Sequence, residues 1–282
     1  MTENLNIYLN TKKRIVIKIG TRILLDREGK PSLSAFKRIC EFSSSLIRQG
    51  KKVILVSSGA IAAGRSLLNI NPRADTFSIP EKQAFASCGQ AILMRNYNAC
   101  FKKYGIKTAQ ILLTKDDISV GKRFANARNT IYELLNHGVV PIINENDTVS
   151  YEEIKFSDND HLSALILNLV CADMFVILSD VNGVYDKNPA IYKNAKSVKI
   201  IDNIRTYVKN FKESSKNSYG TGGMKSKLYA SLIASINGID TIIISGKNKK
   251  SLNSFISGKS TGTFIPSSVN KINPKNTDFY LL

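Results

Sequence analysis

The sequence is poor in residues that support several common chemistries. Its 282 residues include no tryptophan, two histidines and four cysteines. The cysteines form no Cys-x-x-Cys pair, so their spacing predicts neither a zinc site nor a disulfide framework. No Ser/His/Asp triad can be recognised from the order of the residues. Both histidines lie near the ends of predicted helices, where a structural role explains them. The remaining candidates are reactions that need neither zinc-binding cysteines nor a proton-shuttling histidine.

Long apolar runs are also missing. No run reaches the roughly 18 residues that a membrane span needs, and the first ten residues lack the apolar core of a signal peptide. Because 43% of the residues are hydrophobic, the chain has enough apolar material for a folded core. We expect a cytoplasmic, globular protein with no membrane partner.

Acidic residues are scarce relative to basic ones. The chain has 22 of the former and 40 of the latter, which gives a formal net charge of +18. Such an excess attracts anionic substrates, and a clustered excess binds nucleic acid. The lysines here are spread out in short pairs such as Lys12-Lys13 and Lys51-Lys52, which a general compositional bias explains equally well. We expect no nucleic-acid partner and keep nucleic-acid binding as an alternative function.

Two kinds of apolar segment alternate along the chain. Short β-branched runs predict strands, and longer segments with one apolar face predict helices. The predicted strands are 14–19, 52–56, 108–113, 139–143, 174–178 and 240–244. The predicted helices are 32–49, 80–103 and 124–136, followed by the apolar segments after Asp160 and Lys227. This alternation predicts an α/β fold with a mostly parallel sheet covered on both faces.

A glycine-rich stretch precedes the last of these helices, with the sequence Gly220-Thr221-Gly222-Gly223-Met224-Lys225-Ser226-Lys227. Glycines let backbone N–H groups approach an anion, the helix start adds partial positive charge, and Lys227 adds a full charge. The stretch fits neither the Walker A loop nor Gly-x-Gly-x-x-Gly. It predicts a phosphate site, with a plain flexible loop as the alternative.

Polar residues also stand at or just beyond the ends of predicted strands, among them Lys18, Ser58, Asp147 and Ser179. Ligands bind at the carboxyl ends of parallel strands, so these residues and the Lys227 loop are expected to share one cleft. Two lysines and several glycine turns suit phosphoryl transfer, which needs mainly positioning and charge neutralisation. A carboxylate acceptor fits, because it is already ionised and needs no general base.

Simpler structural roles remain open for some of these groups. Residues 144–147 are able to close a turn, and the carboxylates of Asp158 and Asp160 suit the cap of the following helix. For Asp160 the two roles are compatible, because a carboxylate at a helix start can also hold two lysines in position.

Five segments, in order and with compatible spacing, closely resemble the glutamate 5-kinases of the amino acid kinase family. They are Ile17-Lys18-Ile19-Gly20-Thr21, Ser58-Gly59-Ala60-Ile61-Ala62-Ala63-Gly64, Pro141-Ile142-Ile143-Asn144-Glu145-Asn146-Asp147, Asp158-Asn159-Asp160 and Gly220-Thr221-Gly222-Gly223-Met224. The resemblance implies the three-layer α/β/α sandwich of the amino acid kinase (carbamate kinase-like) fold. It also implies transfer of the γ-phosphoryl group of ATP to the side-chain carboxylate of L-glutamate, the first step of proline biosynthesis.

The resemblance also implies roles for individual residues. Lys18 and Lys227 are expected to neutralise the transferring phosphoryl group, and Asp160 to orient the two lysines. The expected glutamate-binding residues are Ser58, Gly59, Ala60, Asp147 and Asn159. The expected nucleotide-binding residues are Lys18, Gly20, Ser179, Asp180, Thr221, Gly222, Gly223, Met224, Lys225, Ser226 and Lys227. Mg²⁺ is expected to arrive with the nucleotide, held largely by its phosphates and water, so no protein metal ligand is assigned.

The resemblance divides the chain into an extension at 1–13, a kinase domain at 14–266 and a tail at 267–282. Many relatives carry an additional carboxyl-terminal PUA module, for which this tail is too short, so none is expected here. Feedback inhibition by proline and a homo-oligomeric state are expected from the family. The enzymatic alternative is another kinase of the same fold that acts on N-acetylglutamate, aspartate, carbamate or UMP. Residues 144–147 and 158–160 favour free glutamate as the acceptor.

Overall fold

The computed structural model describes residues 8–70, 77–119, 121–149, 159–211, 223–259 and 261–268. A seven-stranded sheet runs through their centre in the order β3-β4-β2-β1-β5-β8-β9. All neighbouring strands pair in parallel except β9, which is antiparallel to β8. The strands are β1 Arg14–Ile19, β2 Lys52–Ser57, β3 Lys107–Leu113, β4 Val139–Glu145, β5 Met174–Ser179, β8 Asp240–Ser245 and β9 Thr263–Ile265.

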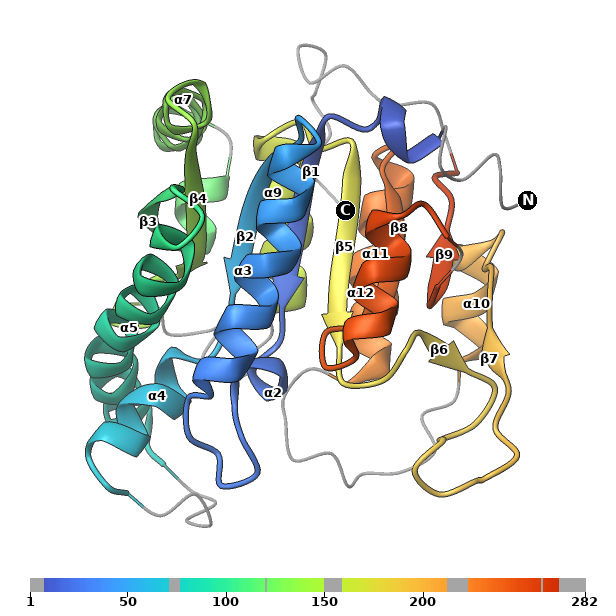
Figure 1. The fold of residues 1–282 in the computed structure, drawn as a ribbon, viewed down its shortest axis with the longest axis horizontal. Coiled ribbons are helices and arrows are strands. Elements are labelled where there is room, and N and C mark those ends of the chain that lie inside the picture. Colours follow the sequence, from blue (N-terminus) through green and yellow to red (C-terminus); the bar gives the residue numbers. More distant parts are fainter. Residues whose placement is uncertain are drawn as a thin grey trace.

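Helices cover both faces of this sheet, as Figure 1 shows with α3 and α12 in front of the strands and α9 and α11 behind. The front layer consists of α3 Leu33–Arg48, α4 Ala60–Leu67, α5 Ile79–Lys102 and α12 Lys249–Ile256. The back layer consists of α6 Lys115–Ile118, α7 Lys122–Asn136, α9 Asn159–Leu169, α10 Ile204–Asn210 and α11 Met224–Ile236. Short α2 Thr21–Leu24 follows β1, and β6 Val184–Tyr185 pairs with β7 Ser197–Val198. The three-layer α/β/α sandwich expected from the sequence is confirmed.

The alternation of side chains along β1 explains how one strand serves both layers. Ile15, Ile17 and Ile19 belong to the core under α3, α5 and α12, whereas Val16 belongs to the core under α9 and α11. Successive strand residues point to opposite faces, so Lys18 points to the same side as Val16. The sequence register of β1 therefore directs the Lys18 amine toward α9 and α11.

Two glycines allow α4 and α5 to cross with their backbones in contact. A Cβ on Gly89 would lie 1.8 Å from the carbonyl oxygen of Ala60, and one on Gly64 would lie 1.8 Å from that of Phe85. Real Cβ atoms do not approach backbone atoms so closely, so only glycine fits at these two positions. This crossing fixes the start of α4 at Ala60 against the middle of α5.

Asp240, the first residue of β8, ties together segments from both ends of the described chain. Its carboxylate accepts hydrogen bonds from the Tyr8 hydroxyl, from Lys12 Nζ at 2.7 Å and from the Ser267 backbone at 2.8 Å. Burial would raise the pKa of Asp240, but the hydrogen bonds from Lys12, Tyr8 and Ser267 outweigh it and lower the pKa below its usual 3.8. Residues before β1 and residues after β9 thus pack on the fold.

We expect Asp240→Asn to reduce stability in a pH-dependent way. A folded-state pKa below 3.8 means that the carboxylate contributes its full stability above about pH 3.8 and loses it as the pH falls below that value. At pH 7 the loss should be about 1.5–3 kcal/mol, the range for hydrogen bonds to a charged group. Urea unfolding at pH 7 and pH 3 measures it, with exposed Asp202→Asn as control. An equal loss at both pH values would contradict this account.

The structure differs from the sequence predictions in a few places. Asn144 and Glu145 were expected to follow the fourth strand, but they are its last two residues and pair with Leu112 and Leu113 of β3. The ladder continues because β3 extends equally far. The strands β6, β7 and β9 and the helices α2, α6, α10 and α12 were not expected, because they are short. Within the described residues, no helix is long and apolar enough to cross a membrane.

Candidate active site

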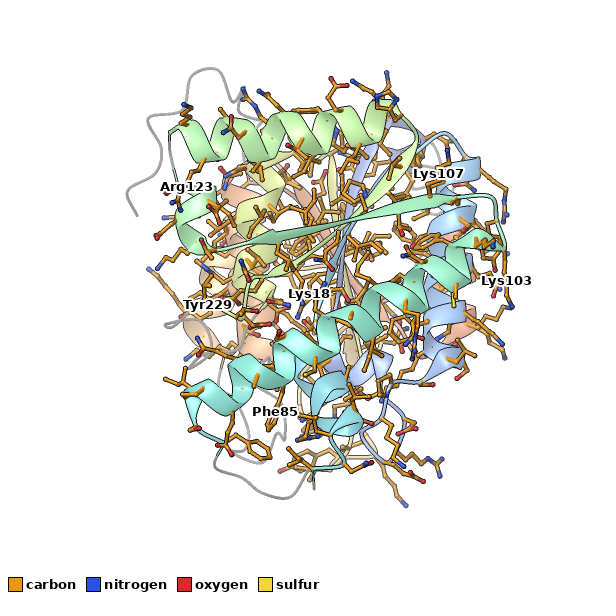
Figure 2. All side chains as sticks on the ribbon, turned by 90° about the vertical axis from the view of Figure 1, so that its left-hand side faces the viewer. Lys18, Phe85, Lys103, Lys107, Arg123 and Tyr229 are labelled. Atoms are coloured by element: carbon orange, nitrogen blue, oxygen red, sulfur yellow. The ribbon has the colours of Figure 1, made fainter. Side chains whose placement is uncertain are left out.

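Three charged side chains from distant parts of the chain meet beneath the carboxyl edge of the sheet, which is the lower edge in Figure 1. Asp160, in the first turn of α9, forms ion pairs with Lys18 through Oδ1 and with Lys227 through Oδ2, the latter at 3.5 Å. The three residues are 0%, 3% and 7% exposed. Figure 2 shows Lys18 deep inside the molecule, whereas Lys103, Lys107 and Arg123 lie at its periphery. The sequence expectation that Lys18 and Lys227 lie in one place agrees with this geometry.

The carboxylate of Asp160 stays ionised in this setting. Burial would raise its pKa, but the charges of Lys18 and Lys227, with hydrogen bonds from Lys18 and Ser226, lower the pKa from 3.8 to about 2. Two ammonium groups around one carboxylate leave the cluster with a net positive charge at neutral pH. A buried site with excess positive charge favours an anionic ligand.

The first turn of α11 locks the second lysine in place. Ser226 donates from Oγ to Asp160 Oδ2 at 2.7 Å, and Lys227 donates from Nζ to the carbonyl of Gly223 at 3.2 Å. The N-terminal end of α11 therefore faces the same point as the amines, and its partial positive charge adds to theirs. Gly220, Thr221 and Gly222 lie outside the described residues. Lys225 points elsewhere, with its Nζ 5.9 Å from the ring centre of Tyr229.

Asn159, the residue before Asp160, organises a second part of the site. Its Nδ2 lies 3.0 Å from the Ser57 carbonyl oxygen and 3.0 Å from Ser58 Oγ. It also lies 2.9 Å from Asn144 Oδ1. The ends of β2 and β4 and the start of α9 are thus joined by one amide group. The predicted residues Ser58 and Asn159 lie in direct contact.

Gly59 and Ala60 form the start of α4 next to Ser58. Gly59 has φ +105°, a left-handed conformation that favours glycine, and it allows the chain to turn sharply from β2 into the helix. The Ala60 amide is at the first position of α4, where backbone N–H groups lack helical partners. This turn therefore offers backbone donors at the carboxyl end of β2.

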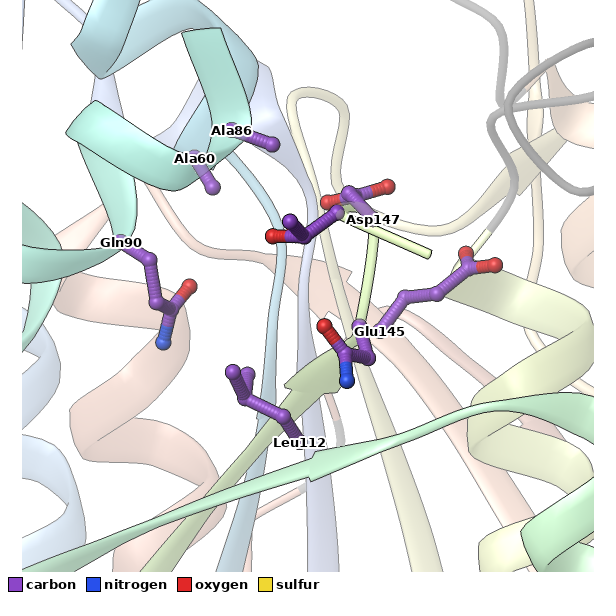
Figure 3. Close-up of a pocket in the computed structure, with 8 residues that line it drawn as sticks. Ala60, Ala86, Gln90, Leu112, Glu145 and Asp147 are labelled. Atoms are coloured by element: carbon purple, nitrogen blue, oxygen red, sulfur yellow. The ribbon is translucent and has the colours of Figure 1, made fainter. Parts of the chain in front are cut away.

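A shallow, open hollow lies beside this turn. Ala60 and Asp147, both predicted from the sequence, line it together with residues that the sequence did not single out, including Gln90 and Ala86. In Figure 3, Gln90 and Ala60 face Asp147 across the hollow, and Leu112 lies below them. The hollow is bounded by α4, α5 and the segment after β4.

Ser179 is the last residue of β5, on the other side of Lys18, and Asp180 follows it. Ser179 donates to Asp180 Oδ1 at 3.2 Å, and Arg22 lies 3.3 Å from Asp180 Oδ2. Burial would raise the pKa of Asp180, but Arg22 and, at longer range, Lys227 lower it below its usual value. Gly20 lies near Lys18, whose Nζ is 3.9 Å from the position of the absent Cβ of Gly20.

The donor set of the site fits a polyphosphate better than a metal ion bound by the protein. In the part of the chain that the structure describes, no group of three or more His, Cys, Asp or Glu side chains is placed to hold a metal. Two buried ammonium groups and a helix start instead provide positive charge and N–H donors. A divalent cation at this site would therefore be held mainly by the phosphates it accompanies.

Comparison with known proteins agrees with this geometry. Residues 13–245 match the amino acid kinase family. The glutamate 5-kinase of Pelobacter propionicus is 46% identical over 255 residues, which cover 90% of this chain and 68% of the relative. The glutamate 5-kinase of Clostridium acetobutylicum is 43% identical over 260 residues, which cover 92% of this chain and 97% of the relative. This chain belongs to the amino acid kinase family, among its glutamate 5-kinases.

Two solved structures of UMP kinases have the same fold. The UMP kinase of Bacillus anthracis superposes with a TM-score of 0.61 at 15% identity, over 92% of this chain and 97% of that chain. The UMP kinase of Ureaplasma parvum gives a TM-score of 0.62 at 15% identity, over 90% of this chain and 99% of that chain. At such low identity these likenesses concern the architecture alone.

Sequence reasoning missed some residues of this amino acid kinase site. Gln90 stands in the middle of α5, where no strand end or glycine turn marks it. The bond from Ser226 to Asp160 was also missed, because it joins two residues 66 positions apart. The periodicity of α5 carries one signal, because Gln90 is a polar residue on the helix face that carries Ala86, Leu93 and Tyr97. In the structure Gln90 is 9% exposed.

Proposed function

We propose that this chain transfers the γ-phosphoryl group of ATP to the side-chain carboxylate of L-glutamate. A carboxylate oxygen of glutamate forms a bond to the γ-phosphorus, and the bond from that phosphorus to the β,γ-bridging oxygen breaks. The products are L-glutamyl 5-phosphate and ADP, and no proton has to be removed from the ionised acceptor. The observation that supports this function most directly is the buried Lys18–Asp160–Lys227 cluster beside the Ser58–Asn159 pair.

The lysine cluster serves the phosphoryl group. Phosphoryl transfer gains most from fixed positive charge, because negative charge spreads over the transferred oxygens. Lys18 and Lys227 approach Asp160 from β1 and α11, so their amines are held on two sides of one buried carboxylate. Asp160 thereby acts as a positioning residue for both amines. Mg²⁺ carried by the nucleotide supplies further charge neutralisation when bound.

The two ends of the site divide the substrates between them. Ala60 and Asp147 line the hollow, Ser58 and Gly59 directly precede Ala60, and Asn159 contacts Ser58, so we assign these five residues to glutamate. We assign Gly20, Ser179, Asp180 and the stretch from Thr221 to Lys227 to the nucleotide. This division follows the chain, because the acceptor side comes mostly from the first half and the nucleotide side mostly from the second.

A hydroxamate assay tests this function. Purified protein with Mg-ATP, L-glutamate and hydroxylamine should form γ-glutamyl hydroxamate. ADP should be released in proportion to the hydroxamate. EDTA in excess over Mg²⁺ should abolish the reaction, because the nucleotide then lacks its metal. Turnover of N-acetylglutamate without turnover of glutamate would contradict the assignment of the acceptor.

Addition of L-proline to the assay tests the expected feedback inhibition. Size-exclusion chromatography tests the expected homo-oligomeric state.

The net charge of +18 leaves nucleic-acid binding as an alternative function, which has a test of its own. A nucleic-acid-binding protein should bind RNA or DNA with an affinity that falls steeply with salt. The kinase should instead retain turnover at salt concentrations that abolish such binding.

A further inference from the structure

Four side-chain amides form a hydrogen-bonded chain from the predicted acceptor site to the edge of the sheet. Asn159 Nδ2 donates to Asn144 Oδ1 at 2.9 Å, and Asn144 Nδ2 donates to Gln90 Oε1 at 2.9 Å. Gln90 Nε2 in turn donates to Gln110 Oε1 at 3.2 Å. The chain joins α9, β4, α5 and β3. Each of the first three amides donates to the next one.

A backbone carbonyl identifies this direction. The oxygen of Ser57 can only accept, so the Asn159 atom 3.0 Å away must be the NH₂ group. Asn144 must then offer its oxygen to Asn159 and its NH₂ to Gln90. Gln90 Oε1 is thus the acceptor that satisfies the Asn144 NH₂, in a place where Asn144 is 1% exposed and Gln90 is 9% exposed.

The direction of the chain determines what the site offers a ligand. With Nδ2 of Asn159 turned to Ser57, Ser58 and Asn144, its Oδ1 lies on the opposite side of the amide. That oxygen is an acceptor. The amide nitrogen of Asn159, 3.0 Å from Ser58 Oγ, cannot accept a hydrogen bond, so the Ser58 hydroxyl proton is directed to another acceptor. The pair therefore presents one acceptor and one donor side by side.

Free glutamate matches this arrangement. Its only hydrogen-bond donors at neutral pH are the N–H groups of the α-ammonium, since both of its carboxylates are ionised acceptors. An acceptor such as Asn159 Oδ1 therefore meets the ammonium, and a donor such as the Ser58 hydroxyl meets a carboxylate. An inverted Asn159 amide would turn its NH₂ toward the ammonium and repel it.

We propose that Gln90 is a positioning residue for acceptor selectivity. By accepting from Asn144, it holds the amide chain in the direction that turns the Asn159 oxygen to the α-ammonium of the substrate. Gln90 also lines the hollow next to Ala60 and opposite Asp147, so it adjoins the same volume (Figure 3). This inference rests on the proposed function, because it concerns the acceptor side of that site.

The test compares L-glutamate with glutarate, which has the same two carboxylates and no amine. Gln90→Met keeps the length of the side chain but removes the acceptor for Asn144. It should lower the preference for glutamate over glutarate in kcat/KM by about tenfold, the size expected when a buried donor loses its acceptor. The change should appear in KM for glutamate, with kcat within about threefold and KM for ATP within about twofold.

Two further variants separate this role from a general packing effect. Gln90→Glu keeps an acceptor for Asn144 and should keep or raise the preference, because repulsion of carboxylates affects both substrates alike and a negative charge attracts the ammonium that only glutamate has. Gln49→Met makes the same exchange at an exposed position at the end of α3 and should change nothing. A preference unchanged in Gln90→Met, or lost equally in Gln90→Glu, would overturn the proposal.

The failure of the proposed function has a different signature. Wild-type protein that phosphorylates neither acceptor contradicts the kinase assignment and leaves the amide chain to be tested by binding. Calorimetric titration of wild-type protein and Gln90→Met with glutamate and with glutarate then supplies the same comparison. Loss of glutamate affinity alone supports the role of Gln90, and equal affinities in the two proteins overturn it.

Discussion

Replacing Lys227 by methionine is expected to lower kcat about 100-fold, the effect of removing one fixed charge contact from a transition state. Lys227 suits this test because Asp160 keeps its ion pair with Lys18 and its hydrogen bond from Ser226. The buried carboxylate therefore stays compensated, and the fold should survive. Because the amine acts on the transferring phosphoryl group, KM for glutamate should change little.

Steady-state kinetics of γ-glutamyl hydroxamate formation measure this effect. Lys103→Met is the matched control, since Lys103 is exposed and lies far from Lys18 (Figure 2). Lys18→Met should reduce kcat similarly but also lower stability, because it removes the closer partner of a fully buried carboxylate. A kcat of Lys227→Met within threefold of wild type would show that the amine has no role in the reaction.

Gly89→Ala is expected to damage both the fold and the acceptor site. The added Cβ would lie 1.8 Å from the Ala60 carbonyl oxygen and 2.5 Å from the Gly64 nitrogen, so α4 and α5 must move apart. Overpacking of this kind costs about 1–3 kcal/mol. Because α4 begins at Ala60, its displacement should also lower kcat/KM for glutamate about 100-fold, the usual effect of a shift near 1 Å.

Thermal unfolding and kinetics at a temperature where the variant is folded separate the two effects. Ser87→Ala, on the exposed side of α5 two residues earlier, adds no backbone contact and is the control. KM for ATP should stay near its wild-type value, because Ser179, Asp180 and the start of α11 do not touch the crossing. A stable, fully active Gly89→Ala would refute the backbone contact as a requirement of the site.

The sequence predicts the framework of the site well for a physical reason. Buried parallel strands need continuous β-branched runs, and ligands bind at their carboxyl ends. The strands that contain or precede Lys18, Ser58 and Ser179 therefore locate these residues. The amines of Lys18 and Lys227 meet in the structure as this reasoning expects. The roles assigned to them stay predictions until kinetics are measured.

Other parts of the site have no local signature. Gln90 reaches Asn144 only because the Gly64–Gly89 crossing sets the position of α5, and such a contact depends on two helices at once. Short elements such as β6 and β9 are equally hard to predict, since two or three residues give no periodicity. Asn144 and Glu145 extend β4 because β3 continues beside them, a property of the pair and not of either segment.

The order of the strands has a consequence for how this architecture diversifies. Strands β1 to β4 come from residues 14–145 and form one half of the sheet, whereas β5, β8 and β9 come from residues 174–265 and form the other. The border between the halves runs between β1 and β5, directly beneath Lys18. Most of the residues proposed for the acceptor therefore come from a different stretch of the gene from most of those proposed for the nucleotide, with Lys18, Gly20 and Asn159 as the exceptions. Selection can remodel most of the first pocket while most of the second stays intact.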